Sequence, residues 1–172
     1  MSETFQEYRD RVLGYLGDQD PIMVQEQTPR QLRTLVSELS SDVLLFRPKD
    51  DEWCIVEIVL HMADAELAMA WRLRNMLATP GVQLSWFDEN QWSRALDYSR
   101  KDIRQALDLF TNLRRSNLEL LRFIPRDKWD LYYGVHSLRG RQTISEFVRL
   151  EAAHDLSHLR QIEQVLAVNR AS

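Results

Sequence analysis

The sequence has little of what several classes of protein need. Its 172 residues include one cysteine, Cys54, which excludes an internal disulfide and any metal cluster built on several thiolates. Five glycines and five prolines leave few positions to interrupt long helices, and runs of β-branched residues bounded by turn dipeptides are scarce. The composition therefore predicts an all-α protein, and the cysteine usage favours a cytoplasmic one.

Two further absences concern partners. No stretch reaches the roughly 18 apolar residues of a transmembrane helix, and residues 1–11 are polar and acidic, so we expect neither a membrane span nor a signal peptide. The net charge is −4 and the arginines are scattered among acidic residues, so we expect no nucleic-acid binding. Hydrophobic residues make up 44% of the chain, enough for a single domain over residues 1–172.

Helical periodicity organises most of the chain. It predicts a first helix from Phe5 to about residue 16, and a second that begins with Thr28 as N-cap and Pro29 at its first position. Longer helices are predicted at 52–78, at 99–124, and from the capping-box pair Thr143 and Glu146 to about residue 168. The pattern predicts a four-helix bundle with an additional N-terminal helix and a long crossover between the second and third bundle helices.

Three histidines lie on the predicted inward faces of two of these helices. His154 and His158 are four residues apart, so they differ by about 40° around the helix axis and can share one ion. His61 lies midway along the most apolar helix, with the small residues Ala65 and Ala68 on the same face. Three imidazoles are the ligand count of a catalytic metal site that keeps a fourth position open. We therefore predict a divalent metal, zinc, nickel or iron, bound by these histidines.

Several other residues are candidates for supporting roles. Asp64 and Asp155 are close enough in sequence to orient the histidines by hydrogen bonding, and Glu151 lies one turn before His154, where a general base would be useful. His136 lies in an aromatic-rich connection and is expected to be exposed, with a pocket-lining role as the alternative. Cys54 is expected to be a buried small residue rather than a reactive thiol.

The segments "WCIVEIVLHMADAE" and "GRQTISEFVRLEAAHDLSHLRQI", together with "FDENQW", resemble the DinB/YfiT-like superfamily of four-helix bundle proteins. The resemblance covers residues 28–168 and implies metal ligation at His61, His154 and His158. It also implies a metal-dependent hydrolase, or a transferase that uses a low-molecular-weight thiol and acts on a small electrophilic substrate. One departure is Cys54, at a position where the family often has a hydroxyl residue as helix cap.

The same three histidines are also consistent with other functions. The protein could be a non-catalytic bundle that a metal stabilises or that senses a ligand. A di-iron carboxylate bundle needs two Glu-x-x-His pairs, and the chain offers one, Glu151 with His154. A zincin-like peptidase is disfavoured because Asp155 lies where that motif has glutamate. The aromatic connections favour a homodimer.

Overall fold

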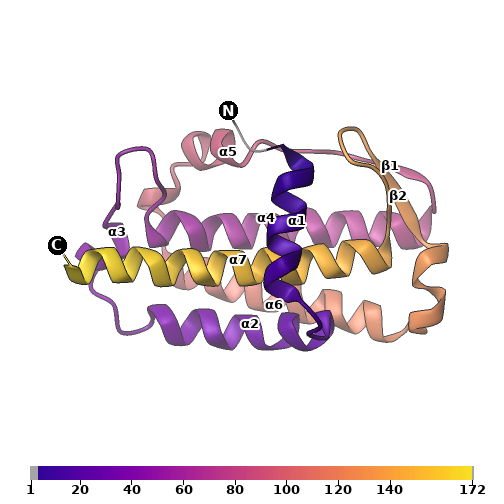
Figure 1. Cartoon of the computed structure of the whole chain (residues 1–172), viewed down its shortest axis with the longest axis horizontal. Helices are drawn as coiled ribbons and strands as arrows, with labels where there is room; N and C mark the ends of the chain where they lie inside the picture. The colour runs from indigo at the N-terminus through magenta and orange to yellow at the C-terminus, as the bar shows by residue number, and fades with distance from the viewer. Residues whose placement is uncertain (1–3, 172) are drawn as a thin grey trace.

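The computed structural model describes residues 4–171, and four long helices dominate it. They are α2 (Pro21–Val36), α4 (Ile55–Ala78), α6 (Ile103–Arg122) and α7 (Ile144–Ala171). In cross-section the helices contact one another in a ring: α4 with α6, α6 with α2, α2 with α7, and α7 with α4. The expected four-helix bundle is therefore confirmed, and α1 (Phe5–Leu16) crosses the outside of α7, as Figure 1 shows.

The core of the bundle forms from one apolar face of each long helix. Almost fully buried residues form its largest cluster, and they include Leu32, Ile58, Met62, Phe110 and Ile162. The spacing of such residues at three and four positions is what the sequence periodicity predicted. Among the described helices, none combines the length and the apolar character needed to cross a membrane.

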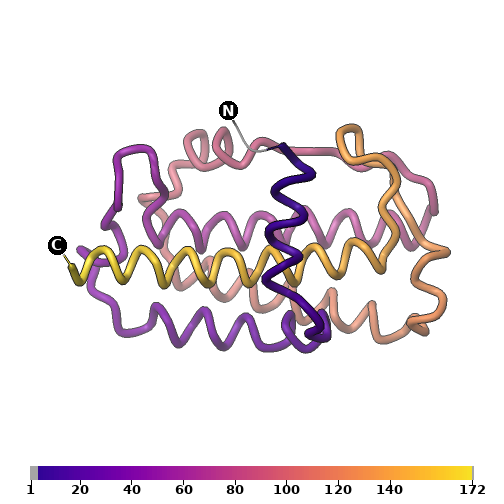
Figure 2. Tube along the Cα trace, viewed as in Figure 1, coloured from indigo at the N-terminus to yellow at the C-terminus, as the bar shows by residue number. Residues whose placement is uncertain are grey.

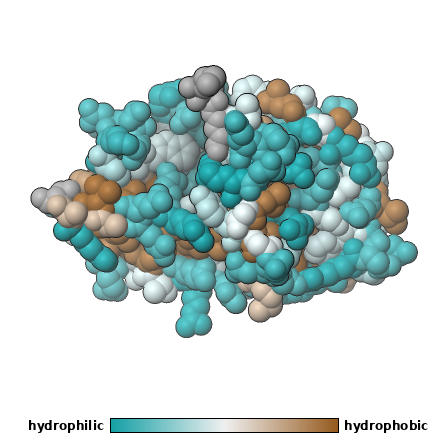
Figure 3. Space-filling view, in the orientation of Figure 1, coloured by the Kyte–Doolittle hydropathy of each residue, from teal (hydrophilic) through white to brown (hydrophobic). Residues whose placement is uncertain are grey.

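Short elements fill the connections. They are α3 (Ser41–Leu45), α5 (Glu89–Ala95), and the 3-10 turns η1 (Tyr98–Arg100) and η2 (Arg126–Leu131). The Cα trace in Figure 2 shows the long crossover between α4 and α6 running back along the bundle. The face seen in Figure 3 is mostly hydrophilic, with small hydrophobic groups scattered over it.

A small sheet, which the composition did not predict, joins the two long connections. Strands β1 (Val82–Leu84), β2 (Tyr133–His136) and β3 (Gly140–Thr143) pair in the order β1-β2-β3. β1 lies parallel to β2, and β2 and β3 form an antiparallel hairpin. Gly140 has a φ of 71° at the turn of this hairpin, a backbone conformation that glycine adopts at little cost. The sheet fastens the crossover to the start of α7.

The predicted start of the second helix was wrong. Helix α2 begins at Pro21, and the side chain of Asp20 accepts hydrogen bonds from the backbone N–H groups of Ile22 and Met23. Pro29 lies inside the helix, where it has no N–H to donate to the carbonyl of Gln25. The guanidinium of Arg114 donates to that carbonyl instead, at 3.2 Å. This hydrogen bond from α6 thus compensates for the backbone hydrogen bond that Pro29 cannot make.

The helix caps explain where two other helices begin. Cys54 is buried and stands at the N-cap of α4, where its backbone N–H donates to the Glu57 carboxylate at 2.9 Å. At the start of α7 the backbone N–H of Thr143 donates to Glu146, and the Glu146 N–H donates to the Thr143 hydroxyl. The expectations of a buried Cys54 and of a capping box at Thr143 are confirmed.

Candidate metal centre

The three histidines of the long helices meet inside the bundle. His61 on α4 and His154 and His158 on α7, hereafter the histidine cluster, each offer one ring nitrogen within 4.8 Å of the others. The Nε2 atom of His154 lies 3.2 Å from Nε2 of His61 and 3.0 Å from Nε2 of His158. His154 and His158 lie together because they are one turn apart on α7, and the packing of α4 against α7 brings His61 beside them.

The chemistry of the cluster fits a divalent ion. Ligand nitrogens about 2.0–2.1 Å from a tetrahedral ion lie about 3.4 Å from one another, so the separations of His154 Nε2 from the other two Nε2 atoms need only a small opening. Gln161 supports the same conclusion, because its Oε1 lies 2.8 Å from Nδ1 of His158. When Nδ1 donates to that oxygen, the lone pair is on Nε2, and the ring is held in the tautomer that a metal requires.

The environment keeps these imidazoles neutral. Burial lowers the pKa of His61 and of His154 well below the ordinary value, and it lowers the pKa of His158 to about 4. A neutral imidazole has a lone pair to donate, so the ligands need not lose protons at neutral pH. The Trp53 ring lies against the cluster, with its centroid 4.9 Å from that of His61.

Behind the cluster lies a buried ionic network centred on Arg114 of α6. Its guanidinium donates to both oxygens of Glu66, at 3.1 and 2.9 Å, and to both oxygens of Asp155. Asn117 donates to Glu66 at 2.8 Å. Asp155, which we expected beside the histidines, is therefore bound by Arg114, and this network joins α4, α6 and α7 just behind His154.

Glu151 lies one turn before His154 and is almost fully buried. Burial is the largest cause that raises its pKa to about 8, and the nearby carboxylates of Glu66 and Asp155 add to the effect. The carboxyl group is consequently protonated in much of the metal-free protein at neutral pH. A bound cation would lower this pKa and make the group exchange protons more readily near neutrality.

Asp64 lies elsewhere. Its carboxylate accepts a hydrogen bond from the hydroxyl of Tyr98, which belongs to η1. This contact fastens the crossover to α4. Burial, together with this hydrogen bond, raises the pKa of Tyr98 above the ordinary range. The structure shows a hydrogen bond of Asp64 to Tyr98 and none to the histidine cluster.

A cavity of about 630 Å³ opens beside the histidine cluster. Its wall combines the cluster with aromatic, apolar and ionisable side chains, which include Trp53, Ala65, Met69, Arg72, Trp86, Phe87, His136, Arg139, Leu150 and Glu151. A concave space that combines apolar and aromatic surface with convergent polar groups is typical of a small-molecule site. The small side chain of Ala65 lies in this wall as the sequence suggested, whereas Ala68 does not line the cavity.

The expectation that His136 is exposed was wrong. The residue is 2% exposed at the end of β2, where its Nδ1 accepts the backbone N–H of Leu138 at 3.1 Å. Burial and the charges of Arg139 and Arg72 lower its pKa to about 4. The strand pairing of β2, which the sequence did not predict, is what carries this side chain to the cavity wall.

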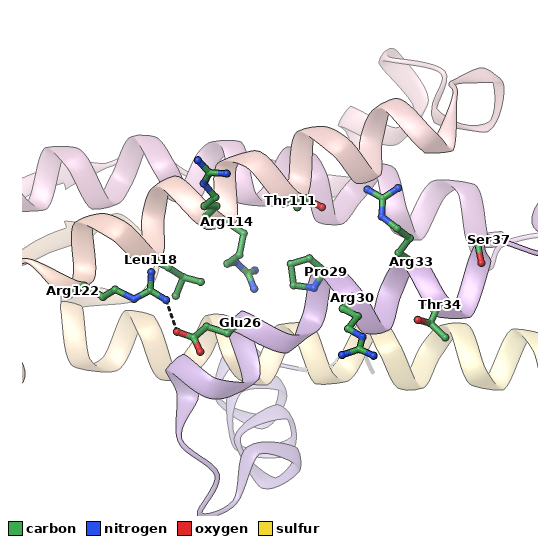
Figure 4. Close-up of a pocket in the computed structure, with 11 residues that line it drawn as sticks. Glu26, Pro29, Arg30, Arg33, Thr34, Ser37, Thr111, Arg114, Leu118 and Arg122 are labelled. Carbon is green, nitrogen blue, oxygen red and sulfur yellow. Dashed lines mark hydrogen bonds and ion pairs between the residues drawn. The ribbon is translucent and has the colours of Figure 1, made fainter.

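A second hollow, of about 720 Å³, lies between α2 and α6 (Figure 4). Several arginines line it, but Arg33 pairs with Asp108 and Arg122 pairs with Glu26. Its arginine charges are thus partly neutralised within the protein itself, and it holds no histidine. The hollow beside the histidine cluster is the better candidate for chemistry.

Sequence reasoning missed Arg114, Arg72 and Tyr98. One signal for Arg114 was available, because it lies four residues after the inward Phe110 and four before the inward Leu118. A charged side chain on an apolar helix face predicts a buried partner of opposite charge. No comparable signal existed for Tyr98, because the crossover that carries it has no periodicity.

Residues 25–162 match the sequence profile of the DinB superfamily. The chain belongs to the DinB superfamily. Within it, the chain is 24% identical over 137 residues to OB0782 of Oceanobacillus iheyensis, covering 80% of this chain and 78% of that protein. It is 22% identical over 144 residues to YfiT of Bacillus subtilis, covering 84% and 81%. Both relatives are provisionally named metal-dependent hydrolases.

The solved structure of Bacillus subtilis YfiT has a similar fold. The two structures superpose with a TM-score of 0.79 at 21% identity, over 95% of this chain and 88% of that one. That structure is described as having an unusual four-helix bundle topology. The DinB fold expected from the sequence is thereby confirmed.

Proposed function

We propose that this DinB-superfamily protein is a metal-dependent enzyme that acts on a small electrophilic substrate, by hydrolysis or by transfer of the substrate to a low-molecular-weight thiol. The observation that carries the proposal is the convergence of three Nε2 atoms, from His61, His154 and His158, at the wall of a cavity. The provisional names of the relatives support the hydrolytic branch.

The residues around the cluster have separable roles in this proposal. His61, His154 and His158 would hold a zinc, nickel or iron ion, and Gln161 orients the last of them. When bound, such an ion supplies Lewis acidity to a substrate or to its nucleophile. The cavity holds the substrate beside the cluster.

Glu151 is the proposed proton-transfer residue. Its carboxyl group lines the cavity and has a pKa raised toward neutrality. The carboxylate form takes the proton of the incoming water or thiol, and the acid form returns it to the leaving group. Asp155 and Asp64 are proposed as positioning residues, since Arg114 and Tyr98 respectively hold their carboxylates.

A non-catalytic bundle stabilised by metal is the alternative. A structural site closes all four ligand positions with protein groups, and the described residues bring three ligands together next to open volume. This geometry favours the enzyme.

The test measures metal content in the purified protein beside two variants. His158→Ala should lose the metal, and His136→Ala is the matched control, because it removes the fourth histidine of the chain without touching the cluster. Gln161→Leu should weaken metal affinity by about 10–100-fold. Equal metal content in the wild type and His158→Ala would overturn the proposal.

Activity is then measured on an activated ester in water and on an alkyl halide with a bacillithiol-like thiol. Turnover that depends on added metal and is abolished in His158→Ala supports the enzyme and identifies its branch. Metal that binds with no turnover in either assay, across a panel of such substrates, favours the non-catalytic alternative.

We also propose a cytoplasmic homodimer. Trp71 and Leu67 lie one turn apart on α4 and are 68% and 48% exposed, which suits an interface. The single buried thiol of Cys54 supports a reducing compartment. Sedimentation of the protein as a monomer at micromolar concentration would contradict the dimer.

A further inference from the structure

Two guanidinium groups line the cavity without a carboxylate partner. Arg72 is 5% exposed, and its donors reach the backbone carbonyl of Ser85 and the sulfur of Met69, the latter at 3.8 Å. Arg139 lies over the ring of Phe5, with its guanidinium carbon 4.5 Å from the centroid. In the described part of the chain no carboxylate comes within ion-pair distance of either. A buried arginine normally has an anion beside it.

A third donor lies in the same wall. Nδ1 of His136 accepts the N–H of Leu138, so the neutral ring carries its hydrogen on Nε2. Across residues 4–171, this Nε2 is the one buried side-chain nitrogen or oxygen that lacks a hydrogen-bond partner. An unpartnered buried donor calls for a ligand, because nearly all buried polar groups have a hydrogen-bond partner. Arg72 and Arg139 line the same cavity as His136.

The position of these donors along the cavity is informative. Arg72 follows His61 by eleven residues on α4, about 16 Å along the axis. On α7, Glu151 precedes His154 and also interacts with Arg72, so α4 and α7 run in opposite directions along the cavity. Arg72 therefore lies toward one end of the cavity and the histidine cluster toward the other, with Met69 and Leu150 in the wall as well.

The acidic residues of the wall do not neutralise this end. Asp88 accepts the N–H of Gln91 as the N-cap of α5, and Glu89 is exposed to solvent. Burial raises the pKa of the Glu151 carboxyl group to about 8, which favours its uncharged form near neutral pH in the metal-free protein. The donors at this end thus remain available to a ligand.

We propose that Arg72, Arg139 and the Nε2–H of His136 form a subsite for an anionic group of the substrate, a carboxylate or a phosphate. The substrate is then an elongated molecule with its reactive bond at the histidine cluster, an apolar middle, and a negative charge at the far end. This assignment of a substrate class rests on the proposed function, but the anion subsite itself is measurable without it.

The test is titration calorimetry at low salt with three probes of equal chain length: hexanoate, hexyl phosphate and neutral hexanamide. The protein is titrated both as purified and after removal of metal by a chelator, because a metal ion can also bind a carboxylate. The wild-type protein should prefer the two anions over the amide by at least about tenfold in both states, since charge-assisted hydrogen bonds are stronger than neutral ones. The stronger of the two anions identifies the group.

The variants locate the binding. Arg139→Gln, at a half-buried position of the β2–β3 hairpin, should remove most of the preference for anions. Arg72→Gln, on α4, should have the same effect. Arg141→Gln is the matched control, because Arg141 lies in the same hairpin, stacks on Tyr133 and does not line this cavity. Equal binding of anions and amide by the wild type, or an unchanged preference in Arg139→Gln, would overturn the subsite.

The two proposals fail in different ways. His158→Ala should lose metal and keep the anion preference of the metal-free wild type. A protein that binds metal at the cluster but shows no anion preference retains the proposed function and loses the subsite. One that prefers anions but binds no metal retains the subsite and loses the proposed function.

Discussion

Arg114 is a charged side chain in the middle of an apolar bundle, 2% exposed, and it forms ion pairs with Glu66 and Asp155. Its two partners together carry one more charge than it does. The same guanidinium also donates to the carbonyl that Pro29 leaves without a helical partner. A single residue of α6 thus stabilises the interior of α2 and holds the segment of α7 that carries His154.

We predict that Arg114→Met lowers the free energy of unfolding by about 3–5 kcal/mol, because two buried carboxylates lose their partner. Urea denaturation measures this loss. The neighbouring variant Arg115→Met is the control, since Arg115 is 78% exposed in its pair with Glu119, and such pairs contribute at most about 1 kcal/mol.

A second variant tests the cause of this loss. Asp155→Asn removes one of the two unpaired charges, so in the Arg114→Met background it should restore part of the stability. If Arg114→Met is no less stable than Arg115→Met, the buried network does not hold the helices together as described.

At the scale of elements, the long helices could be predicted and the sheet could not. The periodic apolar residues of α4, α6 and α7 are local signals, so their faces and the capping box at Thr143 followed from the sequence. Strands β1 and β2 are three and four residues long and about fifty residues apart. Their pairing depends on tertiary contacts, which a local pattern does not contain.

The residues of the site also fall into those that the sequence predicted and those that depend on tertiary contacts. Helix geometry alone placed His154 beside His158, and the inward face of α4 placed His61 toward them. The error at Pro29 arose because a proline normally starts a helix rather than lying inside one, and its compensation by Arg114 comes from another helix. His136 depends on the β2 pairing in the same manner.

Gly134 provides a test of the sheet. It pairs with Val82 of β1, and a Cβ atom added to it would lie 2.5 Å from Cγ of Leu84. We predict that Gly134→Ala lowers the free energy of unfolding by about 1–3 kcal/mol through overpacking, as measured by urea denaturation. Gly14→Ala in α1 is the matched control, because nothing lies within 4 Å of its added Cβ, and it should be neutral or stabilising by about 0.5–1 kcal/mol.

The explanation by overpacking has its own check. In the background of Leu84→Ala, the Gly134→Ala change should cost much less than it does alone, because the clashing atoms are gone. Strictly additive losses would show that the contact between β1 and β2 is not the reason for the glycine.

At the scale of the whole molecule, buried ionisable groups from several helices share one interior, and they respond to pH with opposite signs. The pKa values of the three cluster histidines are lowered by burial, that of His158 to about 4. The pKa of Glu151 is raised to about 8. Each group changes the pH dependence of folding according to the protons that it binds in the folded and unfolded chains.

The signs follow from these shifts. Below pH about 6.5 the histidines of the unfolded chain become protonated, whereas the buried histidines of the folded chain stay neutral. The free energy of unfolding of the metal-free protein therefore decreases as pH falls toward 4. Glu151 acts the other way, because between about pH 4.5 and 8 the folded chain holds a proton that the unfolded chain releases. Its contribution to stability is present in acid and is lost as pH rises through 8.

We therefore predict that the stability of the metal-free protein is greatest near neutral pH and falls more steeply on the acid side, where the three cluster histidines, together with His136, outweigh one carboxyl group. Urea denaturation of chelator-treated protein from pH 4 to 9 measures the profile, with a slope of about 1.4 kcal/mol per pH unit for each proton. Glu151→Gln should flatten the decline between pH 7 and 9 and retain the decline in acid. The control replaces His61, His154 and His158 together by Gln, which should weaken the loss of stability in acid. If this loss is undiminished in the triple variant, it originates outside the histidine cluster.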